Sequence, residues 1–199
     1  MASALKILIF ALVLCLAPIN SQSFFKGTGC VPSSTSCDFY QTCIDSSVAC
    51  GTDGYAIGYG GKFCQKFGAE ISKFSEKGQK WVSAVRLCLQ KKLLESFTGS
   101  VAPTCPVILN KGFASHPDCY TKPDGVSSVC DLSCEDWSAL LDIVGATFLD
   151  TSHFSTLLKT YGQAVQTAFK CGIKTTVKGV LCLPLIASRI LKMSAQTKL

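Results

Sequence analysis

Apolar residues recur at three- and four-residue spacing through most of the chain beyond its first sixty residues. The stretch after Gly61 carries Phe63, Phe67, Ile71 and Phe74 at spacings of four, four and three. This is the period of an amphipathic helix, and no sustained period-two alternation, which predicts strands, is found. The pattern predicts an all-α fold, a disulfide-stapled domain of about five to six helices.

A second helical stretch follows Gly78, and its apolar residues share one predicted face. They are Trp81, Val85, Cys88 or Leu89, Leu93 and Phe97. Basic residues are frequent in the same region, and we interpret them as a solvated helix face rather than a polyanion site. They are Lys62, Lys66, Lys73, Lys77, Lys80, Arg86, Lys91 and Lys92.

The next element is predicted to be a short helix that Thr104 caps. Pro106 fits there only because proline is tolerated in a first helical turn. The expected apolar residues are Val107, Ile108 and Phe113. The segment Ser115-His-Pro-Asp118 predicts a break after it, with His116 as a turn residue at the helix end.

Three further helices are expected in the last third of the chain. Ser133 is a predicted N-cap, and Glu135 and Asp136 suit the positive end of its helix. The expected apolar face is Trp137, Leu140, Leu141, Val144 and Phe148.

Ser152 is predicted to cap the following helix, which Gly172 closes. The residues expected to point inward are Phe154, Leu157 or Leu158, Tyr161, Val165, Ala168 and Phe169. A last helix from about Thr175 is expected to kink at Pro184.

The N-terminus has the layout of a secretory signal peptide. Lys6 precedes an unbroken apolar run over 7–17, Pro18 ends the run, and Ser21 offers a small residue for cleavage. The run is too short to span a bilayer, which takes roughly 20 apolar residues. We expect a signal peptide over 1–21 and one domain over 22–199, with a cross-linked core over 30–182 and a short tail over 190–199. The expected location is extracellular, without membrane insertion.

The chain contains thirteen cysteines, of which Cys15 lies in the expected signal peptide. The remaining number is even, and an even set in an exported chain predicts a disulfide framework. The twelve are Cys30, Cys37, Cys43, Cys50, Cys64, Cys88, Cys105, Cys119, Cys130, Cys134, Cys171 and Cys182.

Charge and motifs argue against several functions. The formal net charge is +6 and no run of five or six like charges occurs, so no nucleic-acid partner is expected. The two histidines, His116 and His153, stand in no catalytic motif, and Gly-x-Ser-x-Gly is absent. A zinc site would need unpaired thiols. We therefore expect no enzyme, no metal and no cofactor.

Several short motifs share their order and spacing with one family. Phe74–Cys88 resembles the stanniocalcin segment in which Phe and Gly lead into an amphipathic helix ending on Cys. Cys64-Gln-Lys-Phe67 is similar to that family's Cys-x-x-Phe, and Cys119-Tyr120 to its Cys-Tyr pair. His153-Phe-Ser155, followed by an apolar helix to Cys171, also has the family's layout. The resemblance covers roughly residues 30–171.

The resemblance implies a particular disulfide pairing. Carried over from the family, the pairs are Cys30–Cys43, Cys37–Cys64, Cys50–Cys105 and Cys88–Cys119. A fifth would join Cys171 to Cys130 or Cys134, and Cys182 would take the remaining cysteine. Sequence order favours Cys130–Cys171 and Cys134–Cys182.

The chain also departs from that family. Family members carry a lone late cysteine that joins two chains, whereas the even count here leaves no obvious spare thiol. We therefore expect a monomer or a non-covalent homodimer. The family's glycosylation sequon and long polar tail are not found either.

The resemblance implies a secreted, hormone-like, non-enzymatic signalling protein, linked in that family to calcium and phosphate balance. Its expected partner is a cell-surface receptor or another extracellular protein. One alternative is a carrier of apolar ligands, although the aromatic residues that suggest it are expected mainly to fill the core. They are Phe63, Phe67, Trp81, Phe113, Trp137, Phe148 and Phe169. A defence or venom-type effector is the other alternative.

Overall fold

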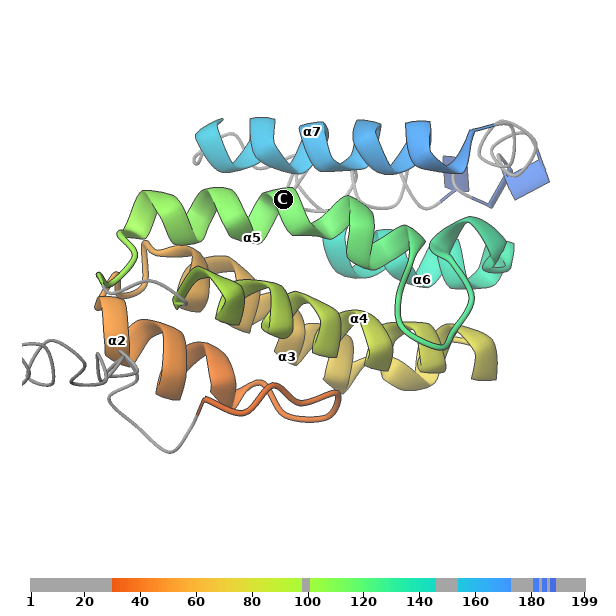
Figure 1. Ribbon diagram of the computed structural model, residues 1–199. Coiled ribbons are helices and arrows are strands. Elements are labelled where there is room, and N and C mark those ends of the chain that lie inside the picture. The colour runs from red at the N-terminus through yellow and green to blue at the C-terminus, as the bar shows by residue number, and fades with distance from the viewer. Residues whose placement is uncertain are drawn as a thin grey trace, which may run out of the picture.

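A computed structural model describes residues 30–97, 101–145 and 154–172 and six further positions between 181 and 188. This part of the chain is helical and contains no strand, which confirms the predicted all-α fold. In Figure 1 the outermost helix, α7, lies along α5, and α5 separates it from α4 and α3. The candidate interaction surface described below is carried by α7.

The first described segment is a set of short helical pieces. The π-helical turn η1 (Tyr40–Asp45) runs into α2 (Ser46–Val48), and the π-helical η2 (Tyr55–Gly61) runs into α3 (Lys62–Ala69). A side chain at Gly60 would collide with the rings of Tyr40 and Tyr55. Glycine at this position therefore lets η1 and η2 pack closely around two buried tyrosines.

The helix α4 (Glu76–Leu94) buries the face that its sequence predicts. Trp81, Val85 and Leu93 are buried, and Phe97 follows in the 3-10 turn η4 (Glu95–Phe97). The helix begins at Glu76, two residues before Gly78, and its N-cap is Ser75, which the sequence analysis did not identify. A short 3-10 turn, η3 (Ile71–Lys73), separates it from α3.

One buried carboxylate links the starts of two helices. Asp136 lies in α6 (Cys134–Val144), after the 3-10 turn η5 (Val129–Asp131), and is fully buried. It accepts hydrogen bonds from the backbone N–H of Ser75 (2.7 Å), the Ser75 hydroxyl (2.8 Å) and the backbone N–H of Ser133 (3.2 Å). The predicted N-cap at Ser133 is confirmed, because its hydroxyl accepts from Asp136 to complete a capping box. A side chain at Gly78 would collide with this carboxylate.

The predicted break at residues 115–118 is wrong. The helix α5 (Cys105–Thr121) continues through Pro117, and His116 is buried inside it rather than in a turn. Proline removes one backbone donor and clashes with the carbonyl four residues earlier. The helix nevertheless continues to Cys119, where a disulfide to α4 holds it. Thr104 stands at the predicted start, but its side chain makes no capping hydrogen bond.

The last helix with described bounds is α7 (Phe154–Cys171), and Gly172 ends it as predicted. Gly172 adopts a φ of +56°, and its N–H donates to the carbonyls of Ala168 and Phe169. Several predictions lie outside the described residues: the signal peptide over 1–21, Phe148, the cap at Ser152, most of the helix from Thr175, and the tail over 190–199.

Candidate functional site

Six disulfides fix the helices to one another. Four of them join the pairs that the stanniocalcin resemblance implies, and the other two join the last four cysteines as sequence order favoured. The bonds are Cys30–Cys43, Cys37–Cys64, Cys50–Cys105, Cys88–Cys119, Cys130–Cys171 and Cys134–Cys182. Such a set is compatible with an extracellular protein. Within the residues that the structure describes, no helix is long and apolar enough to cross a membrane.

The helix α7 presents apolar side chains to solvent, which contradicts the inward face predicted for it. The exposed fractions are 55 % for Leu158, 47 % for Tyr161, 52 % for Val165 and 81 % for Phe169. Their spacing of three, four and four places them on one side of the helix. We call these four side chains the α7 outer face.

The inward side of α7 is polar instead. Thr160, Gln163 and Thr167 are buried. Gln163 donates through Nε2 to the Tyr59 hydroxyl at 3.2 Å, and the hydroxyls of Tyr59 and Thr160 lie 3.4 Å apart. The core beneath α7 therefore offers hydrogen-bonding partners that suit polar side chains.

A disulfide explains why α7 has this rotation. Cys171 is bonded to Cys130, so its side chain must point toward η5. Residues three or four apart share a helix face, so Thr167, Gln163 and Thr160 point the same way as Cys171. The opposite face is left to the apolar residues. This signal was present in the sequence, because the expected Cys130–Cys171 pair already indicates which side of the helix faces η5.

No charged residue lies on the α7 outer face. The two lysines of this helix are directed along α5 instead: Lys159 donates to the Asn110 side chain at 2.7 Å, and Lys170 pairs with Asp118 at 2.9 Å. The hydrogen bond from Lys170 lowers the pKa of Asp118. An uncharged apolar strip of this kind on a protein surface is typical of an interaction site.

A cavity of about 40 Å³ lies among aromatic side chains. Its lining includes Tyr40, Tyr55, Tyr59, His116 and Tyr120. Sites for small ligands usually measure about 300–1,000 Å³. The cavity is therefore too small for an apolar ligand. It gives no support to the carrier alternative. Of the aromatic residues that suggested a carrier, Trp81 and Phe113 are buried in the core, and Phe63, Phe67 and Trp137 pack against it half-buried.

His116 is a structural residue of this aromatic interior. Its Nδ1 lies 2.7 Å from the carbonyl oxygen of Gly112, so Nδ1 carries the proton and donates it. Burial lowers the pKa of His116 to about 4, against smaller opposing effects from the carbonyls of Gly112 and Phe113. The described residues contain no group of three or more His, Cys, Asp or Glu side chains that could hold a metal ion.

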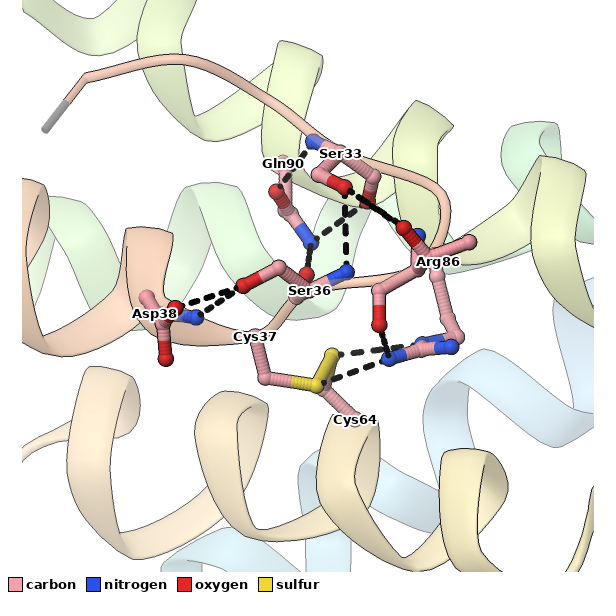
Figure 2. Close-up of a disulfide and its surroundings, with 8 residues drawn as sticks. Ser33, Ser36, Cys37, Asp38, Cys64, Arg86 and Gln90 are labelled. Atoms are coloured by element: carbon pink, nitrogen blue, oxygen red, sulfur yellow. Dashed lines mark hydrogen bonds between the residues drawn. A yellow bond between two sulfur atoms is a disulfide. The ribbon is translucent and has the colours of Figure 1, made fainter.

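Arg86 is buried, which contradicts its predicted place on a solvated face. The seven lysines predicted with it are exposed or half-buried. Figure 2 shows Arg86 beside the Cys37–Cys64 disulfide, with Gln90 next to it on α4. Gln90 accepts from the Ser33 N–H at 2.8 Å and donates to the carbonyls of Ser33 and Ser36 at 3.0 Å each. These two polar residues of α4 therefore hold the segment that leads into η1.

The fold and site define a disulfide-stapled, all-α protein in which one helix, α7, exposes an apolar face to solvent. No protein-family model, curated protein or solved structure matches this chain.

Proposed function

We propose that this chain is a secreted, non-enzymatic signalling protein of stanniocalcin-like type. It acts by binding a cell-surface receptor or another extracellular protein, and the regulation of calcium or phosphate would follow from the resemblance. The observation that carries the proposal is the α7 outer face. Four large apolar side chains on one uncharged helix face give a partner a set of anchors at helical spacing.

We propose that the α7 outer face binds into an apolar groove on the partner protein. An aromatic side chain offers roughly 150–250 Å², so the exposed parts of the four side chains amount to about 400 Å² of apolar surface. A stable interface covers about 800 Å² on each side. A second copy that met α7 only along this face would fall short of that area, whereas a groove that encloses the flanks of the helix would reach it.

The test measures saturable binding of the labelled full-length chain to cultured cells. Val165→Glu and Phe169→Glu should each weaken binding at least tenfold, because each places a charge in the apolar contact. Gln166→Glu is the matched control, since it adds the same charge at an exposed polar position of the same helix and should bind as the wild type does. Circular dichroism should show all three variants folded.

Three results would overturn the proposal. One is a failure of the wild type to bind saturably to any of the cells tested. A second is binding that survives protease treatment of the cells and is reproduced by phosphatidylcholine vesicles, which would identify a lipid surface. A third is a concentration-dependent dimer in sedimentation that Phe169→Glu dissociates, which would assign the face to a second copy.

A further inference from the structure

Arg86 is a buried cation without an acidic partner among the residues that the structure describes. Only 8 % of the surface of this residue is exposed to solvent. None of the ion pairs among the described residues involves it, so no carboxylate there lies within 4 Å. Burying a charge without a counter-ion is costly. This arrangement calls for a compensating interaction, and none of the contacts of Arg86 supplies a full negative charge.

The guanidinium of Arg86 donates to both sulfurs of one disulfide. Its Nη2 lies 3.1 Å from Cys37 Sγ, its Nε lies 3.4 Å from Cys64 Sγ, and Nη2 also donates to the Thr35 carbonyl at 2.9 Å. Figure 2 shows the two sulfurs beside the guanidinium, with dashed lines for its hydrogen bonds to them. Gly68 leaves room for this arrangement, because a Cβ there would lie 3.2 Å from Nη2. Among the described residues, no other disulfide sulfur accepts a hydrogen bond from a charged side chain.

A disulfide sulfur is a weak, neutral acceptor, whereas the thiolate formed on reduction is an anion. The positive charge of Arg86 therefore stabilises the reduced state more than the oxidised state, and a stabilised thiolate is also a better leaving group. We propose that Cys37–Cys64 is a redox-labile disulfide, opened by an extracellular dithiol reductant of the Cys-x-x-Cys class, with Arg86 as the counter-ion of the released thiolate.

The surroundings of the two sulfurs indicate which of them the reductant attacks. Cys37 is half-buried and lines a groove of about 640 Å³, whereas Cys64 is buried and lines the small cavity of about 40 Å³. The attacking thiolate forms a bond to Cys37 Sγ, the Cys37–Cys64 bond breaks, and its electron pair leaves with Cys64 Sγ beside Arg86. The second thiol of the reductant then attacks the mixed disulfide and releases Cys37. The dithiol is oxidised by two electrons, and the protein gains two thiols.

Opening this bond should be a local event. The segment before η1 remains held by the three hydrogen bonds of Gln90 and by the Cys30–Cys43 disulfide. Reduction would release α3 from that segment without freeing either from the rest of the molecule. The redox state of this bond could therefore change the surface around η1 and α3 while the remaining five disulfides keep the fold.

The experiment equilibrates the full chain with graded dithiothreitol, traps thiols by alkylation and quantifies each cysteine peptide by mass spectrometry. In the wild type, Cys37 and Cys64 should be alkylated at the lowest reductant concentration, and the other ten cysteines serve as internal controls. Arg86→Gln should make the bond about tenfold harder to reduce, which corresponds to about 30 mV. Arg86→Lys, which keeps the charge, should lie close to the wild type. Lys91→Gln removes an exposed charge from the same helix and should change nothing.

A purely structural role for Arg86 predicts the opposite sign. Loss of packing in Arg86→Gln would then loosen the site and make Cys37–Cys64 easier to reduce. That result would overturn the proposal, as would a wild type in which another disulfide opens first. If Arg86→Gln does not fold, the order of reduction in the wild type and the behaviour of Arg86→Lys decide the question.

Discussion

The helices α4 and α7 are of similar length and flank α5 on opposite sides, yet they bury opposite kinds of residue. Trp81 and Leu93 of α4 face the core, whereas Thr160 and Thr167 of α7 do so. The face of α4 follows its hydrophobic pattern, and the rotation of α7 follows its disulfide. Burial of apolar surface usually orients a helix, but a covalent bond at one end of a helix can oppose that preference.

The first prediction compares α4 with α7 by truncating one aromatic side chain on each helix, and it has the largest expected effect on the free energy of unfolding. Trp81→Ala removes a fully buried ring whose Nε1 donates to the Tyr120 carbonyl at 3.1 Å. It should lower the free energy of unfolding by about 3–5 kcal/mol. Phe169→Ala on the α7 outer face should change it by no more than about 0.5 kcal/mol.

Denaturant unfolding under non-reducing conditions measures both changes. Equal destabilisation by the two variants would show that Phe169 is packed against the molecule in solution, and the contrast between the helices would disappear. A small effect of Trp81→Ala would instead mean that the core under α4 adjusts to the loss of the ring.

The second prediction removes the bond that fixes the rotation of α7. The double variant Cys130→Ser, Cys171→Ser opens a ring whose ends are 41 residues apart in sequence. It should cost about 2–4 kcal/mol of stability. Because α7 then loses its anchor to η5, its amides should exchange with solvent faster, while those of α4 should not.

Hydrogen exchange read by mass spectrometry checks this localisation. The matched control is Cys50→Ser, Cys105→Ser, which opens a comparable ring at the other end of α5. Its effect should fall on η2 and the start of α5. If α7 exchanges at the wild-type rate without Cys130–Cys171, its polar contacts to Tyr59 rather than the disulfide set its rotation.

Local patterns in the sequence predicted the helices of this molecule well. The spacing of Trp81, Val85 and Leu93 identified the buried face of α4, and Ser133 and Gly172 marked helix ends by their ordinary capping chemistry. These signals depend on neighbours in the chain, so a single sequence contains them. The hydrophobic pattern supplied none of the disulfide pairs: the stanniocalcin resemblance implied four of them, and sequence order favoured the pairing of the last four cysteines.

Contacts between distant residues are what the sequence analysis missed. Pro117 suggests a break, but the helix survives because α5 is tied to α4 by Cys88–Cys119 and packed on both sides. Arg86 belongs by composition to a run of exposed lysines, yet it is buried against a disulfide that joins two other segments. The α7 outer face was assigned inward because its apolar residues were considered without the bond at Cys171.

The third prediction concerns the interior between α4 and α7, where His116 lies on α5. Its ring packs against Tyr59, which bonds the polar side of α7, and against Tyr120, whose carbonyl accepts from Trp81. Burial lowers the pKa of His116 from its ordinary 6.5 to about 4. The unfolded chain therefore takes up a proton below about pH 6.5 that the folded chain refuses until about pH 4, so stability falls as pH falls through this range.

The slope should approach 1.4 kcal/mol per pH unit between pH 6 and 5. His116→Gln should remove this slope of stability against pH. The stability lost when Asp118 and Glu95 are protonated should remain, and it falls at more acidic pH because the pKa values of both groups are lowered. Denaturant unfolding of both proteins across pH 7 to 4 gives the difference. An equal slope in the two proteins would mean that water reaches His116 in the folded state. The region around His116 would then be hydrated like the polar side that faces α7, and the water-free core of α4 would extend only as far as Trp81.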